Sequence, residues 1–143
     1  MSRMIYGDQR SAWERKLADL KADCNTVITA GIEVETSLGA ERFSLTSEDQ
    51  INIQNLSLQV ATGAPTVLYH ADGQLCRAFT AEEITVVGTA AVSFVTYHTT
   101  YFNHLKAWVE RTTNADELKA IAYGAELPAD LQASMNALIG GAT

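Results

Sequence analysis

The sequence predicts a single-domain α+β protein. Two hairpin-then-helix patterns follow each other, at 32–62 and 66–111, and a strongly periodic helix precedes them. The chain has 143 residues, of which 47% are hydrophobic, and this is enough for one buried core. We therefore expect one domain over 1–143, with a flexible N-terminus at 1–8, an N-terminal helix at 9–31, a ββα-ββα core at 32–111 and a helical tail at 112–143.

The N-terminal helix is predicted by a single apolar stripe. Its members recur at spacings of three and four: Trp13, Leu17, Leu20, Cys24 and Val27. Gly31 is expected to end the helix, because glycine tolerates the left-handed conformation that follows a last turn. This helix needs a partner for its apolar face.

Two β-hairpins are predicted from alternating apolar and polar residues. The first pairs 32–36 with 42–45 around a turn at 37–40. The second pairs 66–70 with 75–79 around Ala71-Asp72-Gly73-Gln74, where Asp-Gly is a strong signal for a tight turn. We expect the four strands to form one four-stranded antiparallel sheet with helices against it.

A middle helix lies between the hairpins. Thr46 is a good N-cap, and Asp49 stands three residues later, where its carboxylate can complete a capping box. Ile53, Leu56 and Val60 give the helix an apolar face. Gly63 and Pro65 end it.

The long helix, expected at 81–111, has the clearest periodicity in the chain. Thr80 and Glu83 form its capping box. A heptad seam with spacings of three and four contains Ile84, Val87, Ala91, Phe94, His98, Tyr101, Leu105 and Trp108. The β-branched and aromatic run 96–102 favours a strand by propensity, but it lacks the alternation of a strand. Periodicity therefore predicts a helix that is held by packing.

The seam is a candidate site of self-association. A helix of this length spans about 45 Å and is longer than a compact domain of this size is wide. Trp13, Leu17 and Leu20 on the first helix give a second apolar stripe of the same kind. Either the protein is elongated, or another copy or a folded-back segment of the same chain covers the seam. We expect a second copy, and so a homo-oligomer, for example a trimer.

The tail is expected to contain two short helices that dock onto the domain. Asn114 caps a helix at 115–123 that ends at Gly124. Pro128 opens a second one at 129–139.

Charge and hydropathy exclude several functions. Seventeen acidic and ten scattered basic residues give a net charge of −7, which argues against nucleic-acid binding. No apolar run is long enough for a membrane span, and the N-terminus lacks the apolar core of a signal peptide. Cys24 and Cys76 are expected to be reduced and buried, and the protein to be made in a cytoplasm.

No catalytic, cofactor-binding or metal-binding residues are predicted. A zinc site of His70, Cys76, His98 and His104 is the main alternative, but His98 and His104 are six residues apart and off a common helical face. His98 is better explained as a hydrogen-bonded residue of the seam. Cysteine chemistry by Cys76 with His70 is a weaker alternative, because only Arg77 would activate the thiol.

Several motifs resemble a family of small uncharacterised proteins encoded among the tail, baseplate and tail-fibre genes of bacteriophages and prophages. They are Phe43-Ser44-Leu45-Thr46-x-x-Asp49-Gln50-x-Asn52, Tyr69-His70-Ala71-Asp72-Gly73-x-x-Cys76, Tyr97-His98-Thr99-Thr100-Tyr101-x-Asn103-x-Leu105 and Ala120-Ile121-x-Tyr123-Gly124-x-x-Leu127-Pro128. The sequence departs from the family at Leu38-Gly39, where Asp-Gly is expected, and at His104.

The resemblance implies a virion protein of the phage tail that is made in the host bacterial cytoplasm and contacts other tail proteins. It implies no catalytic residues. A tail-assembly chaperone outside the virion, or a small regulatory module, is the alternative.

Overall fold

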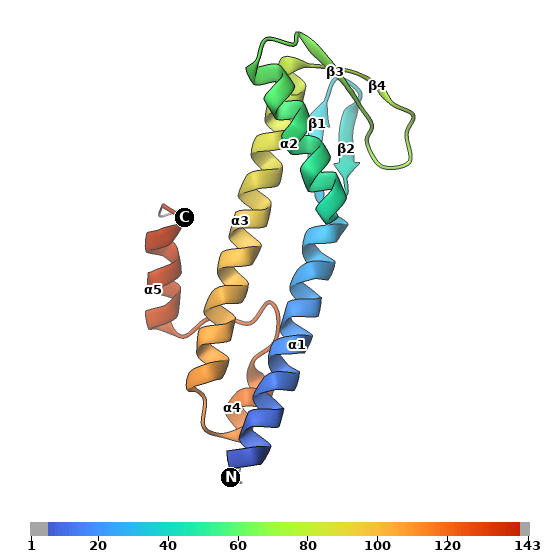
Figure 1. Ribbon diagram of the computed structural model, residues 1–143. Coiled ribbons are helices and arrows are strands. Elements are labelled where there is room, and N and C mark those ends of the chain that lie inside the picture. The colour runs from blue at the N-terminus through green and yellow to red at the C-terminus, as the bar shows by residue number, and fades with distance from the viewer. Residues whose placement is uncertain (1–5, 141–143) are drawn as a thin grey trace. The chain divides into compact units, whose positions relative to one another are not determined.

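The computed structural model describes residues 6–140, and within them it is an α+β structure of five helices and two separate hairpins (Figure 1). In chain order the elements are α1 Tyr6–Ala30, β1 Ile32–Thr36, β2 Gly39–Phe43, α2 Ser47–Ala61, β3 Thr66–Tyr69, β4 Arg77–Thr80, α3 Ala81–Arg111, α4 Ala115–Ala120 and α5 Ala129–Leu138. The first five residues of the segment expected to be flexible lie outside the described range, and residues 6–8 belong to α1.

The chain divides into two compact units. The hairpin unit is Thr26–Thr96, and the helical unit combines the residues up to Asn25 with those from Tyr97 onward. Helices α1 and α3 each contribute to both units. That the whole chain forms one domain stays a prediction.

Local sequence signals account for the helix boundaries. The long helix covers 81–111 as predicted, so packing does override the β-branched run at 96–102. Both predicted capping boxes are confirmed: Thr46 and Asp49 exchange hydrogen bonds at 3.0 Å, and Thr80 and Glu83 do so at 3.1 Å. The Asn114 cap is also present, but α4 ends at Ala120, three residues earlier than expected.

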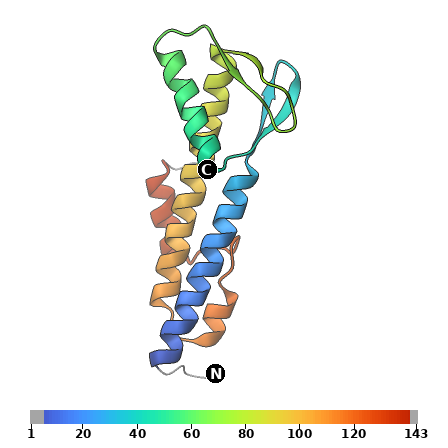
Figure 2. The ribbon, with the colours of Figure 1, turned by 45° about the vertical axis from the view of Figure 1, so that its right-hand side comes forward.

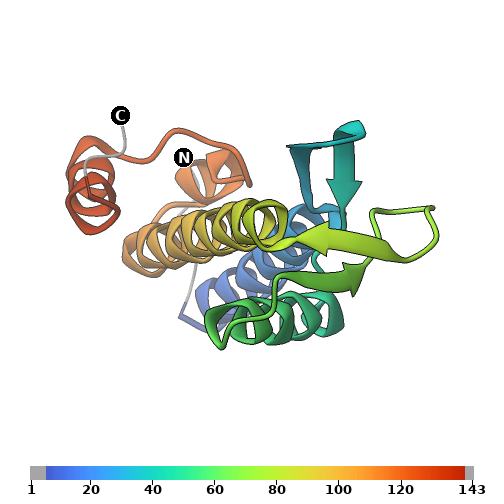
Figure 3. The same ribbon diagram turned by 90° about the horizontal axis from the view of Figure 1, so that it is seen from above.

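The predicted four-stranded sheet is wrong. Within residues 6–140, strand β1 pairs only with β2, and β3 only with β4, so the hairpins are two separate two-stranded sheets, as Figure 3 shows. In the second hairpin Tyr69 pairs with Arg77, and residues 70–76 form a longer loop than the predicted turn.

Side chains and loop atoms join the hairpins where strand pairing was expected. The Asp72 N–H donates to the Arg42 carbonyl oxygen at 2.8 Å, and the Asp72 carboxylate accepts from the Ser44 N–H at 3.0 Å. Arg77 forms an ion pair with Glu41 at 2.8 Å. These contacts join the second hairpin to the first through its loop and through the Arg77 side chain. They take the place of hydrogen bonds between edge strands.

The core of the hairpin unit is aromatic. Phe43 and Phe79 are fully buried, with ring centroids 6.0 Å apart, and Tyr69 stacks on Phe43 at 6.3 Å. Burial raises the pKa of Tyr69 to about 12. One face of the first hairpin, which includes Ile32 and Phe43, is buried in this core.

In the helical unit, Figures 1 and 2 show α1, α4 and α5 arranged around the C-terminal half of α3. Its core contains Leu20, Tyr101, Leu105, Val109, Leu118, Ile121, Leu127 and Met135. Both tail helices therefore dock onto the unit, as predicted. Within the part of the chain that the structure describes, none of the helices has the length and apolarity of a bilayer span.

Candidate functional site

The heptad seam of α3 is covered mainly by the chain itself. Its buried members are Ile84, Val87, Ala91, Tyr101 and Leu105, and its half-buried members are Phe94, His98 and Trp108. On α1, Leu20 is buried, and Trp13 and Leu17 pack against the core of the helical unit. Most of these residues act in intramolecular packing, so the seam as a whole is not free to bind another copy. Self-association itself stays a prediction.

The histidine of the seam is hydrogen-bonded, as predicted. His98 Nδ1 lies 2.6 Å from the Tyr123 hydroxyl, and burial lowers the pKa of His98. The Cys24 thiol is buried and lies 3.6 Å from the His98 carbonyl oxygen. Burial and the neighbouring Cys24 raise the pKa of Tyr123, so its phenol stays protonated at neutral pH.

The other potential metal ligands lie in different settings. His104 is buried, with Nδ1 2.8 Å from the Thr100 carbonyl oxygen and Nε2 3.2 Å from the Ser134 hydroxyl. His70 and Cys76 are exposed, at the two ends of the second hairpin loop. The expected burial is therefore confirmed for Cys24 and wrong for Cys76. Among residues 11–140, whose side chains the structure describes, no three His, Cys, Asp or Glu side chains come close enough together to hold a metal ion.

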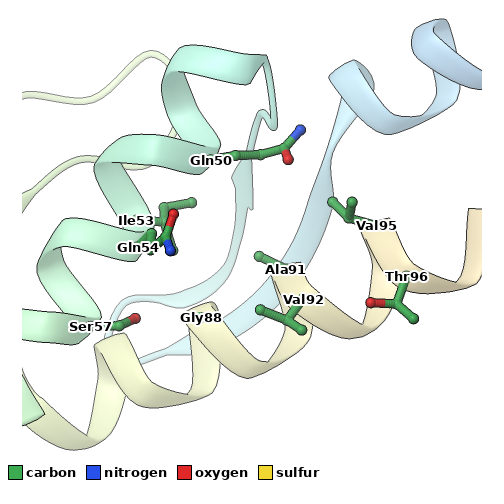
Figure 4. Close-up of a pocket in the computed structure, with 9 residues that line it drawn as sticks. All are labelled: Gln50, Ile53, Gln54, Ser57, Gly88, Ala91, Val92, Val95 and Thr96. Atoms are coloured by element: carbon green, nitrogen blue, oxygen red, sulfur yellow. The ribbon is translucent and has the colours of Figure 1, made fainter. Parts of the chain in front are cut away.

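The most distinctive surface of the hairpin unit lies along α2 and α3 (Figure 4). A groove of about 320 Å³ runs between the two helices, and Ile53, Ala91 and Val95 contribute to its lining. Gln50, Gln54 and Thr96 are further lining residues, and Val92 is 67% exposed. A second depression of about 520 Å³ shares Ser57, Gly88 and Val92 with the groove. We call all the residues that line either of these two depressions the charge-free face.

The close approach of the two helices depends on small residues. Gly88 is buried, and a Cβ atom built on it would lie 2.7 Å from the Ser57 hydroxyl oxygen. Ala61 and Ala91 are further small residues along the two depressions. The small side chains where the helices meet do not cover their neighbours. The apolar and amide side chains beside them therefore remain accessible.

The charge-free face contains no ionisable side chain. No Asp, Glu, Lys or Arg occurs between Asp49 and Asp72 or between Glu83 and Lys106, although 19% of the chain is charged. Solvated helix surfaces usually carry charges, whereas the cores of protein–protein interfaces are depleted of them. Since the lining offers neither a general base nor a metal ligand, its chemistry suits binding.

A comparison with protein families gives one match, to a family described as Domain of unknown function (DUF4376), over residues 11–125. The chain belongs to this family. Searches among curated proteins and among solved structures gave no match.

The family region covers most of this DUF4376 chain. It includes the charge-free face and the His98–Tyr123 pair, and it ends before α5 begins at Ala129. The DUF4376 family description states no activity.

Sequence reasoning missed the charge-free face of this DUF4376 protein. The heptad pattern directs attention to the apolar residues of α3, which are its buried side. The signal that identifies the other side is the absence of charge from 50–71 and 84–105, at exposed as well as buried positions.

Proposed function

We propose that this protein is a structural or assembly component of the tail, baseplate or tail-fibre region of a bacteriophage, and that it works by self-association through the charge-free face. The single observation that carries the proposal is this neutral groove between α2 and α3, in which exposed Val92 lines both depressions. No catalytic residue is assigned.

Charge favours a second copy as the occupant of the groove. Every copy has a net charge of −7, so two copies repel each other over most of their surfaces. The charge-free face is where identical chains meet without bringing like charges together. The aliphatic side chains then supply hydrophobic stabilisation, and Gln50 and Gln54 can pair as donor and acceptor across a two-fold axis.

The phage location rests on the motifs that resemble tail-region proteins. A tail is built from repeated copies of small proteins, and self-association suits that setting. In this proposal the chain is made in the host cytoplasm and enters the virion together with other tail proteins.

Self-association is tested by light scattering of the full chain over a range of concentrations. Val92→Glu places a charge in the groove, and we expect it to shift the protein towards monomer. Val86→Glu is the matched control, because Val86 is 53% exposed on the same helix and lines neither depression. A wild-type chain that is monomeric at all concentrations, or equal effects of both variants, would contradict the proposal.

The location is tested by mass spectrometry of purified particles from a phage that encodes the protein. We expect a fixed number of copies per particle. Absence from particles, together with binding to an unassembled tail protein, would favour a tail-assembly chaperone in its place.

A further inference from the structure

The helical unit contains an aromatic pocket of about 270 Å³, which the proposed function does not use. Aromatic rings dominate its lining: Tyr97, His98 and Tyr101 come from α3, and Tyr123 comes from the segment after α4. Glu126 and Gln132 are the polar side chains that line it beside these rings.

Most polar atoms of this pocket are already hydrogen-bonded inside the protein. The Tyr101 hydroxyl donates to the Ala125 carbonyl oxygen at 2.5 Å and accepts from the Gly124 N–H at 3.0 Å. The Tyr123 hydroxyl pairs with His98 Nδ1, and the Gln132 amide donates to Asn136 at 2.9 Å. The Tyr101 and Tyr123 hydroxyls therefore hold the pocket together and have little capacity left for a ligand.

What the pocket offers a ligand is ring surface and one carboxylate. Tyr97 is 46% exposed and stacks on Tyr101 with centroids 6.3 Å apart. The Tyr101 and Tyr123 rings stand at 78° to each other, 5.1 Å apart, so the rings do not form a flat surface. Glu126 is exposed and has no ion-pair or hydrogen-bond partner within the described residues.

We propose that this pocket binds an alkylated ammonium group. The negative faces of aromatic rings attract cations, and groups of aromatic rings beside a carboxylate recognise quaternary ammonium ligands. The volume is at the small end for ligand pockets, which fits a head group better than a whole drug-sized molecule. The chain's net charge of −7 further favours a cation.

His98 is compatible with the binding of a cation in this pocket. Burial lowers the pKa of His98, so its imidazole is neutral at pH 7 and adds an aromatic surface without a positive charge. A neutral sugar would need several donors and acceptors, and most of those in the pocket are already used within the protein.

The alkylammonium group can come from a free small molecule or from a methylated lysine of a protein. Saturation-transfer NMR and a titration of the full chain with choline, and separately with a peptide that contains trimethyllysine, distinguish these sources. We expect the N-methyl protons of at least one probe to receive saturation. The neutral isostere of choline, with carbon in place of nitrogen, is expected to bind about tenfold more weakly.

Two pairs of variants locate the binding. Tyr97→Leu is expected to weaken binding about fivefold, whereas Tyr97→Phe keeps the ring and the affinity. Glu126→Gln is expected to weaken it by a similar factor, whereas Glu110→Gln, at an exposed acid of α3 outside the pocket, leaves it unchanged. Equal affinity for the neutral isostere, no binding of either cationic probe at millimolar concentration, or unaltered binding by Tyr97→Leu would overturn the proposal.

Discussion

Gly88 of α3 lies so close to Ser57 of α2 that a Cβ atom at position 88 would stand 2.7 Å from the Ser57 hydroxyl oxygen. This contact sets the distance between the two helices of the charge-free face. It also explains why glycine occupies the middle of a long helix, where it otherwise costs about 1 kcal/mol relative to alanine.

A double-mutant cycle tests this contact. Gly88→Ala gains helix propensity but collides with Ser57, so we expect little or no net stabilisation. In a Ser57→Ala background the collision is relieved, and the same change is expected to be more favourable by at least about 0.5 kcal/mol. Chemical denaturation of the four proteins measures the coupling. If the effects of the two substitutions on the free energy of unfolding were strictly additive, the helices would not meet at this point.

The glycines that follow α1 and α2 are expected to differ in their tolerance of alanine. Both have positive φ, 85° at Gly31 and 108° at Gly63. A Cβ at Gly31 would also lie 1.9 Å from the Phe43 carbonyl oxygen, whereas Gly63 has nothing within 4 Å. Gly31→Ala should therefore lower the free energy of unfolding by at least about 1 kcal/mol more than Gly63→Ala. Similar losses in thermal denaturation would contradict the close approach.

Asp72 is expected to stabilise the junction of the two hairpins. Its carboxylate accepts the Ser44 N–H at 3.0 Å, and Asp72→Ala removes that bond. Because Asp72 is exposed, we expect a loss of about 1 kcal/mol in the free energy of unfolding. Asp23→Ala, at an exposed position of α1, serves as control and should change stability by less than about 0.5 kcal/mol.

Glu83 should make part of the stability depend on pH. Hydrogen bonds from the Ser37 and Thr80 N–H groups hold the pKa of Glu83 below its ordinary value of 4.5. A carboxyl with a lowered pKa stabilises the fold above its unfolded pKa, and this contribution is lost as pH falls through the folded pKa. The stability difference between wild type and Glu83→Gln should therefore be constant above about pH 5.5 and shrink below pH 4.5. A difference that does not change between pH 7 and pH 3 would contradict this role.

Local signals in the sequence predicted the helices well. Thr46, Thr80 and Asn114 mark helix starts because their side chains satisfy free N–H groups, a property of a few adjacent residues. The seam predicted α3 against the preference of its β-branched run. The apolar periodicity indicates which side of the helix is buried. In such a helix, this burial outweighs the local preference for a strand.

The arrangement of the hairpins could not be predicted in the same way. Each strand pair is specified by nearby residues, but the contact of Asp72 with Arg42 and Ser44 joins positions about thirty residues apart. A hairpin edge has no sequence signature that distinguishes strand pairing from capping by a loop. The groove was missed for a related reason: an apolar pattern identifies the buried side of a helix and does not describe its exposed side.

Hydrogen exchange of the full chain at low and high protein concentration tests most directly where two copies meet. We expect amides of α2 and of α3 between Thr85 and Thr96 to exchange more slowly at high concentration, while those of α4 and α5 are unchanged. The Val92→Glu variant should lose this concentration dependence. Protection that grows only outside α2 and α3, or at no site although the protein associates, would contradict self-association through the charge-free face.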